Sequence, residues 1–505
     1  SNTSVATVNT SGLVTGVSAG TTTITYTNTN GCQITATVII NALPTITGIL
    51  NVCVGSTRQL TGSATAATSN AWTSSNASVA IVNNSGLVTG ISAGTATITY
   101  TNSNGCQITA TVTVNDLPTI TGILVICANT TTQLTGSATA AATNAWTSSN
   151  TSVATVNTSG LVTGVSAGIT TITYTNSNGC QITATVTVNA LPTVTGTLNV
   201  CVGNSSQITG SGTAATTNAW TSSNTSVATV DNTGLVTSIS AGTTTITYTN
   251  SNGCQRSITF TVNALPTITG ILNVCVGSTR QLTGSATAAT SNAWTSSNTS
   301  VATVNTSGLV TGVSAGTATI TYNNTNGCQI AATITVNDVP TITGTLVICA
   351  GSTTQLTGSA TAATTNAWVS SNTSVATVNT SGLVTGVSTG TTTITYINSN
   401  GCQITASVTI NALPIITGIL NVCVGSTRQL TGSATAATSN AWTSSNTTIA
   451  TVNTSGLVTG ISAGTATITY INSNGCQIST SITINDLPVV ANQAATICSD
   501  SASGV

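Results

Sequence analysis

Residues 94–115 read GTATITYTNSNGCQITATVTVN. Ile98 and Tyr100 fall on the same face of an extended strand, because successive side chains of a strand point to opposite faces. Asn104-Gly105 is a strong short-range signal for a hairpin turn. After it, Ile108 to Val114 alternate apolar residues with threonines. The stretch therefore predicts a β-hairpin with one face turned toward a core.

Close variants of this stretch return at a constant interval along the 505-residue chain. Two cysteine ladders and one tryptophan ladder share the interval: Cys53, Cys127, Cys201, Cys275, Cys349 and Cys423; Cys32, Cys106, Cys180, Cys254, Cys328, Cys402 and Cys476; Trp72, Trp146, Trp220, Trp294, Trp368 and Trp442. A fixed period over a whole chain, here about 74 residues, indicates an array of like units. We therefore expect the function to belong to the array rather than to one catalytic pocket.

A Leu-Pro or Val-Pro pair marks each junction between units. It places complete repeats at 42–115, 116–189, 190–263, 264–337, 338–411 and 412–485. Residues 1–41 correspond to the second half of a repeat, and 486–505 to the start of a following, divergent domain. The chain contains no methionine, so we expect it to be a segment of a much longer polypeptide.

Each repeat contains about seven short runs with strand patterns, separated by turns, and no helical periodicity. This arrangement is typical of an antiparallel β-sandwich of immunoglobulin type. We predict an all-β protein, a tandem array of such sandwiches of about 74 residues each in an extended rod. A strand of 8–9 residues makes each repeat about 35 Å long once turns are added.

The charged residues are four arginines and five aspartates, with no histidine, lysine or glutamate. Nucleic-acid binding needs more cations than this, and no apolar run approaches the roughly 20 residues of a membrane span. Acid–base catalysis needs titratable groups gathered in a pocket. The composition predicts no enzyme, cofactor, metal site, nucleic-acid partner or direct membrane insertion.

The cysteine spacing favours disulfides over buried free thiols or a metal site, because each repeat has two distant cysteines. A repeat this small is marginal alone, and a disulfide within it would stabilise it. We therefore predict pairing inside each repeat; the alternative joins Cys32 to Cys53 across the junction. The predicted pairs are Cys53–Cys106, Cys127–Cys180, Cys201–Cys254, Cys275–Cys328, Cys349–Cys402 and Cys423–Cys476, with Cys32 and Cys498 lacking partners in this segment.

Each tryptophan sits on a short strand in nearly constant surroundings, which favours a core residue packed between sheets. An exposed platform for sugars is the alternative. Tyr100 and its equivalents are expected at the sandwich edge, with the ring inside and the hydroxyl outside.

Four motifs carry a resemblance to the bacterial immunoglobulin-like domain of group 2. They are Trp294 to Asn298, Val301 to Val304, Gly308 to Gly312 and Ala315 to Ile320. The resemblance covers every repeat and implies β-sandwich modules strung into extracellular stalks and adhesins, without a catalytic site. The added cysteines resemble repeats of large surface adhesins of gliding bacteria, of the SprB kind, exported by the type IX secretion system.

These observations predict a structural stalk of a very large secreted adhesin at the bacterial cell surface, supporting attachment or gliding. The alternatives are a multivalent array that binds surface glycans and a phage tail or fibre decoration. Neighbouring chains of a filament are a further possible partner.

One repeat, 190–263, departs from the others. Its last strand carries Arg256, Ile258 and Phe260 where the preceding repeat has Ile182, Ala184 and Val186. We expect Phe260 in the core and Arg256 at the rim. We also hypothesise that Gly212, which replaces an alanine, makes room for the added bulk, with neutral drift at an exposed edge as the alternative.

Overall fold

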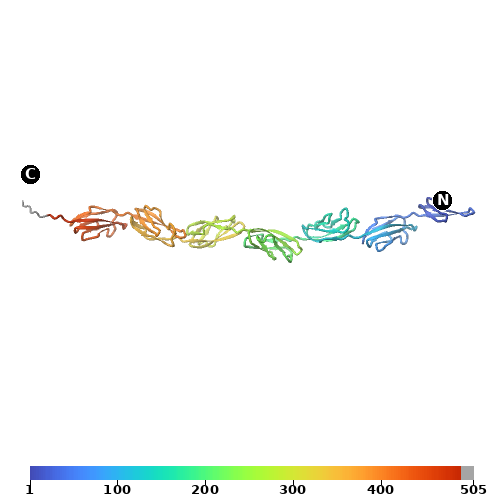
Figure 1. Ribbon diagram of the computed structural model, residues 1–505, viewed down its shortest axis with the longest axis horizontal. Helices are drawn as coiled ribbons and strands as arrows, with labels where there is room; N and C mark the ends of the chain where they lie inside the picture. Colours follow the sequence, from blue (N-terminus) through green and yellow to red (C-terminus); the bar gives the residue numbers. More distant parts are fainter. Residues whose placement is uncertain (491–505) are drawn as a thin grey trace, which may run out of the picture. The chain divides into compact units, whose positions relative to one another are not determined.

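The computed structural model describes residues 1–490. Each complete repeat is a separate body of strands along the chain (Figure 1). The described residues contain strands and turns but no helix. The chain divides into two compact units, Ser1–Asn263 and Ala264–Val505, each considered by itself below.

Nine short strands build the repeat at 42–115. They are β5 (Ile46–Thr47), β6 (Asn51–Cys53), β7 (Thr57–Gln59), β8 (Thr61–Gly62), β9 (Trp72–Ser74), β10 (Ala80–Val82), β11 (Leu87–Gly90), β12 (Gly94–Thr101) and β13 (Gln107–Asn115). The same nine recur with the period of the sequence as β14–β22 within 120–189. They recur again as β31–β39 within 268–337, β40–β48 within 342–411 and β49–β57 within 416–485.

The strands form two facing layers. One sheet has the order β6-β13-β12-β9 and the other has the order β10-β11-β7, while β5 and β8 form a separate two-stranded pair. All pairs are antiparallel except β13 with β6, which run parallel so that Asn115 lies opposite Cys53. The immunoglobulin-like sandwich predicted from the sequence is confirmed.

The central hairpin β12–β13 supplies much of the core. Ile98 lies opposite Ala110 and Ala96 opposite Val112, so a large side chain faces a small one across each pair. Ala96, Ile98 and Val112 are buried. Its turn spans five residues, Asn102 to Cys106, rather than the two of the predicted Asn-Gly turn. Asn102 stabilises it, because its Oδ1 accepts the main-chain N–H groups of Asn104 and Cys106 at 3.1 and 2.9 Å.

The six tryptophans lie in the cores, each with its ring centroid 4.6 Å from that of a tyrosine. Tyr100 is also buried, and its hydroxyl donates a hydrogen bond to the carbonyl of Ala64 at 2.9 Å. The prediction of an outward hydroxyl was therefore wrong, because a nearby carbonyl takes the place of water. Gly62 leaves space for this ring, since a Cβ there would lie 2.4 Å from it.

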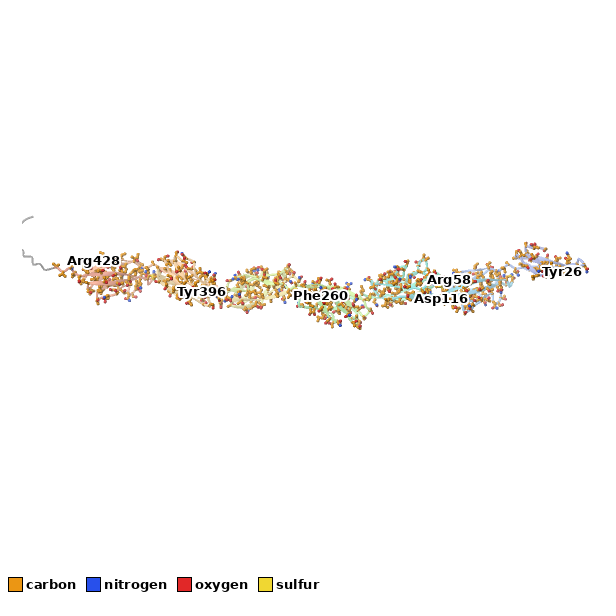
Figure 2. All side chains as sticks on the ribbon, in the orientation of Figure 1. Tyr26, Arg58, Asp116, Phe260, Tyr396 and Arg428 are labelled. Atoms are coloured by element: carbon orange, nitrogen blue, oxygen red, sulfur yellow. A yellow bond between two sulfur atoms is a disulfide. The ribbon has the colours of Figure 1, made fainter. Side chains whose placement is uncertain are left out.

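Residues 1–41 form β1 (Ala6–Val8), β2 (Val14–Gly16), β3 (Gly20–Thr27) and β4 (Gln33–Ile40). The hairpin β3–β4 has the register of β12–β13. Tyr26, equivalent to Tyr100, is 68% exposed (Figure 2).

The divergent repeat consists of β23 (Val194–Gly196), β24 (Asn199–Cys201), β25 (Ser205–Gly210), β26 (Trp220–Ser222), β27 (Ala228–Val230), β28 (Leu235–Ser238), β29 (Gly242–Thr249) and β30 (Gln255–Asn263). Phe260, labelled in Figure 2, is fully buried, as predicted. Arg256 is exposed, also as predicted. The hypothesis about Gly212 was wrong, because a Cβ there would meet no atom within 4 Å. Gly212 has φ +76°, where an alanine side chain is strained.

Candidate functional site: a disulfide clasp between neighbouring repeats

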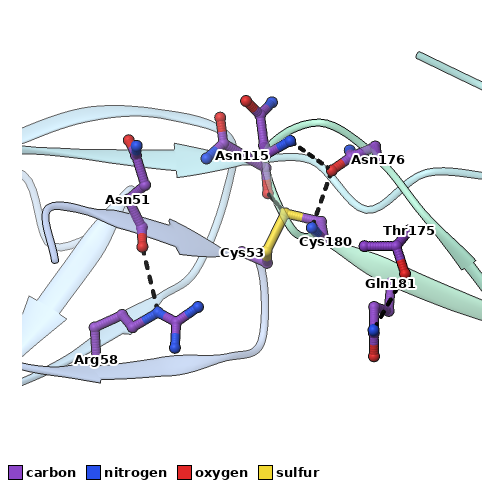
Figure 3. Close-up of a disulfide and its surroundings, with 9 residues drawn as sticks. Asn51, Cys53, Arg58, Asn115, Thr175, Asn176, Cys180 and Gln181 are labelled. Carbon is purple, nitrogen blue, oxygen red and sulfur yellow. Dashed lines mark hydrogen bonds between the residues drawn. A yellow bond between two sulfur atoms is a disulfide. The ribbon is translucent and has the colours of Figure 1, made fainter. Parts of the chain in front are cut away.

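The cysteines join neighbouring repeats. Cys53, at the end of β6, is bonded to Cys180, which lies in the next repeat between β21 (Gly168–Thr175) and β22 (Gln181–Asn189) (Figure 3). The Cα–Cα distance is 5.6 Å, well within the ordinary range for a disulfide. We call this bond, together with Asn115 and Asn176 beside it, the clasp.

The same connection occurs in both compact units, always with a sequence separation of 127 residues. The other pairs are Cys127–Cys254, Cys275–Cys402 and Cys349–Cys476. Cys201 and Cys328 are disulfide-bonded as well. Among the described residues, Cys32, Cys106 and Cys423 carry free thiols. Cys498 lies outside the described residues.

The predicted pairing inside each repeat was therefore wrong, and so was the alternative pair Cys32–Cys53. The predicted partners Cys53 and Cys106 lie at opposite ends of β13, because this strand starts directly after Cys106 and ends beside Cys53. Nine residues of strand span about 30 Å, whereas a disulfide needs Cα atoms within about 7 Å. The same geometry excludes the other five predicted pairs, Cys127–Cys180, Cys201–Cys254, Cys275–Cys328, Cys349–Cys402 and Cys423–Cys476.

The main chain presents both halves of the clasp. On one side, Asn115 lies opposite Cys53, and its carbonyl accepts the N–H of Val54 at 3.0 Å. On the other, Asn176 Oδ1 accepts the N–H of Cys180 at 2.9 Å, which holds the cysteine at the hairpin tip. The Cys180 Sγ atom lies 4.0 Å from the Asn115 carbonyl oxygen (Figure 3). The tip therefore rests against the end of the preceding repeat.

Cys106 lies in the same place at the first junction, where the position 127 residues earlier falls outside the given sequence. Cys106 Sγ lies 4.0 Å from the carbonyl oxygen of Asn41, as Cys180 Sγ does from that of Asn115. Asn102 holds Cys106 with the same 2.9 Å hydrogen bond that Asn176 makes to Cys180.

The clasp is shielded from solvent. Cys180 is 1% exposed and Cys53 is 7% exposed. The Nδ2 atom of Asn115 is also buried, with no hydrogen-bond partner in the described part of the chain. Because reductants must reach a sulfur atom to open a disulfide, this burial favours a persistent structural bond.

Each of five repeats has a shallow hollow beside its tryptophan, about 450 Å³ in the repeat at 42–115. It is lined there by Gln59, Thr61, Ser85 and the edges of Trp72 and Tyr100. These rings are 6% and 2% exposed. Sugar binding on aromatic platforms needs accessible ring faces, so the hollow offers no such platform.

The carboxylates are scattered. Residues 1–490 contain no group of three or more metal-ligating side chains. Asp116 and Asp338 are exposed in junctions. Asp231 lies in a turn, where hydrogen bonds from the Thr233 hydroxyl and the Leu235 N–H lower the pKa of its carboxyl below the ordinary 3.8. No helix in the described range is long and apolar enough to cross a membrane.

Comparison with family models places these features in a known class. The model for the bacterial Ig-like domain (group 2) matches residues 1–38, 46–114, 123–188, 187–262, 266–336, 336–409 and 417–482. The chain belongs to this family. Membership in the group 2 bacterial Ig-like family accounts for the sandwich of each repeat and is consistent with a structural or adhesive role.

Solved structures with similar chains include the N-terminal eight Ig domains of Down Syndrome Cell Adhesion Molecule, at 12% identity and TM-score 0.20, covering 96% of this chain and 80% of that one. Domains 4–9 of the surface layer protein SbsC match at 15% identity and TM-score 0.15, covering 92% and 97%. Drosophila N-cadherin EC1-4 matches at 12% and 0.15, covering 54% and 93%. TM-scores this low add nothing to the family assignment. A search of curated proteins found no match.

Proposed function

We propose that this chain is a spacer segment of a large secreted adhesin, which holds an adhesive region away from a bacterial cell surface. The observation that carries the proposal is the clasp, repeated between neighbouring repeats at a constant separation of 127 residues. A bond between successive repeats adds a covalent link along the array, as a spacer requires. It contributes nothing to a reaction within one module.

Two further features support a spacer outside the cell. Disulfides persist in oxidising compartments, and every complete repeat has one in this chain. The aromatic side chains that would anchor a ligand are used in the cores. An extended rod, export by the type IX system and a part in gliding belong to the same proposal, and rest on the cysteine-containing repeat pattern.

The spacer is tested by changing its length. Deleting residues 116–189 removes one period and brings Cys254 to the position relative to Cys53 that Cys180 holds now, so the clasps can re-form. We expect the shortened protein to reach the surface of the producing cell normally, as seen with antibodies on intact cells. Attachment to a surface should weaken, and inserting one further period should restore it.

The matched control concerns ligand binding by the repeats themselves. The purified chain, with its disulfides intact, should show no saturable binding to immobilised glycans. Saturable binding would favour the multivalent glycan array instead. Recovery of the protein in phage particles rather than on cells would favour the fibre decoration.

A further inference from the structure

The clasp changes which covalent path connects one end of a repeat pair to the other. Ala42 and Ala190 are equivalent junction residues, two periods apart in the sequence. Through the Cys53–Cys180 bond, the path runs only from Ala42 to Cys53 and then from Cys180 to Ala190. The bonded path therefore consists of the short segments 42–53 and 180–190, and the rest of both repeats lies inside a closed loop.

Strands already make up much of this short path in the folded protein. From Cys180 it follows β22, which is a strand from Gln181 to Asn189, and on the other side it includes β5 and β6. A strand rises about 3.3 Å per residue, and a fully stretched chain reaches only about 3.6 Å. The strands on the path can therefore lengthen by roughly a tenth.

We propose that the clasps make the array a tether that cannot lengthen by unfolding. If either repeat between Ala42 and Ala190 unfolds, its residues are released inside the closed loop and add no length to the loaded path. At about 3.5 Å per residue, the two segments and the disulfide between them are limited to about 80 Å. Without the bond the same span could reach about 520 Å.

The second compact unit contains the same arrangement. Ala264 precedes Cys275 by the same interval as Ala42 precedes Cys53, and Cys275 is bonded to Cys402. The strand that follows Cys402, β48 (Gln403–Asn411), is again continuous and leads to the junction residue Ala412. Any two neighbouring repeats that share a clasp are therefore bypassed by the same short covalent path.

The inference rests on the proposed spacer function for its biological use, because only a loaded spacer benefits from a fixed length. Its mechanical content depends on the disulfide connectivity alone.

Force spectroscopy on the full chain tests the tether. Handles are attached at Ala42 and Ala190 through chemistry that does not use cysteine, and mass spectrometry verifies the disulfides before pulling. We expect the oxidised chain to stop lengthening at about 80 Å between these positions. The Cys53→Ser/Cys180→Ser double variant should extend to about six times that length, with unfolding steps. Cys106→Ser, which alters a cysteine outside the Cys53–Cys180 bond, should behave like the unaltered chain.

Reduction of the folded, unaltered chain during pulling provides a second measurement, should the double variant fail to fold. It should release the same extra length in steps. Two outcomes would overturn the tether. One is an unfolding step that extends the span beyond about 80 Å while the Cys53–Cys180 bond is intact. The other is a maximum extension that does not change after this bond is removed. The two proposals can fail separately. If force spectroscopy confirms the limited extension but deleting residues 116–189 leaves surface attachment unchanged, the tether stands and the spacer function is rejected.

Discussion

The neighbouring repeats 116–189 and 190–263 share a clasp, Cys127–Cys254, but differ in what fills them. Both keep a tryptophan and a tyrosine with ring centroids 4.6 Å apart. Phe260, however, occupies the position that Val186 has in the repeat at 116–189, and both side chains are fully buried. The difference shows that the core can change in volume while the aromatic pair and the inter-repeat bond stay the same.

A second difference lies next to the clasp. Ser238 replaces Gly164, where a Cβ would come within 2.8 Å of the Cys127 carbonyl oxygen. In the divergent repeat the Ser238 hydroxyl lies 2.9 Å from the Cys201 carbonyl and 2.7 Å from that of Asn204. The main-chain carbonyl that lies too close for an apolar side chain thus accepts a hydrogen bond from the serine hydroxyl.

The largest expected effect comes from breaking the bond that joins these two repeats. On the chain-entropy model, a disulfide closing a 127-residue loop stabilises the fold by about 5 kcal/mol. In the Cys127→Ser/Cys254→Ser variant we expect amide exchange to accelerate in both repeats, followed in peptides that contain Ile169 or Phe260. Cys106→Ser is the control. Unchanged protection in both repeats would contradict a stabilising clasp.

The core difference is tested by exchanging the two residues. Phe260→Val should leave a cavity and reduce the free energy of unfolding of its repeat by about 2 to 3 kcal/mol. Val186→Phe should cost about 1 to 3 kcal/mol through overpacking, if the surroundings of Val186 are not adapted to a ring. Denaturant-dependent amide exchange in each repeat measures both. A neutral Val186→Phe would show that the two cores are interchangeable.

A smaller effect is expected at the left-handed turn. Ala138 has φ +64°, and Gly212 occupies the equivalent position with φ +76°. Because alanine is strained there, Gly212→Ala should destabilise its repeat by about 1 kcal/mol, and Ala138→Gly should stabilise the other by a similar amount. The pair of variants is compared by the same exchange measurement. Opposite signs would indicate a packing role for Gly212 after all.

The smallest effect concerns pH. Asp231 stands where the preceding repeat has Asn157, and both side chains accept hydrogen bonds from the turn that follows. The pKa of the Asp231 carboxyl is lowered in the folded state. Its contribution to stability is therefore present above about pH 4 and lost as the pH falls through the lowered pKa.

An NMR titration of the chain labelled with carbon-13 in its five aspartates measures this pKa. The signal that disappears in Asp231→Asn should titrate below 3.8. The variant should also lose the acid sensitivity of this turn, as in the repeats that already carry asparagine. A titration at or above 3.8 would show that the turn does not favour the carboxylate.

Much of the fold could be predicted from local signals. Alternating threonines and apolar residues predict the strands, because burial on one face follows from the period of two. The constant interval between the cysteine and tryptophan positions predicts the array, and Phe260 could be assigned to the core by alternation alone. The Gly212 hypothesis failed because alternation says which face a residue lies on and nothing of which distant residues meet it.

The sequence by itself determined that this chain is a row of like sandwiches, where their strands lie, and that its chemistry resides in paired cysteines. Only the tertiary structure decided which cysteines meet. Spacing permits Cys53 to pair with Cys106 as readily as with Cys180, but the parallel alignment of β6 with the end of β13 places Cys106 a full strand away. The same alignment brings the next repeat's hairpin tip to Cys53. Disulfide geometry tolerates only a few ångströms, so strand order rather than sequence distance selects the partner.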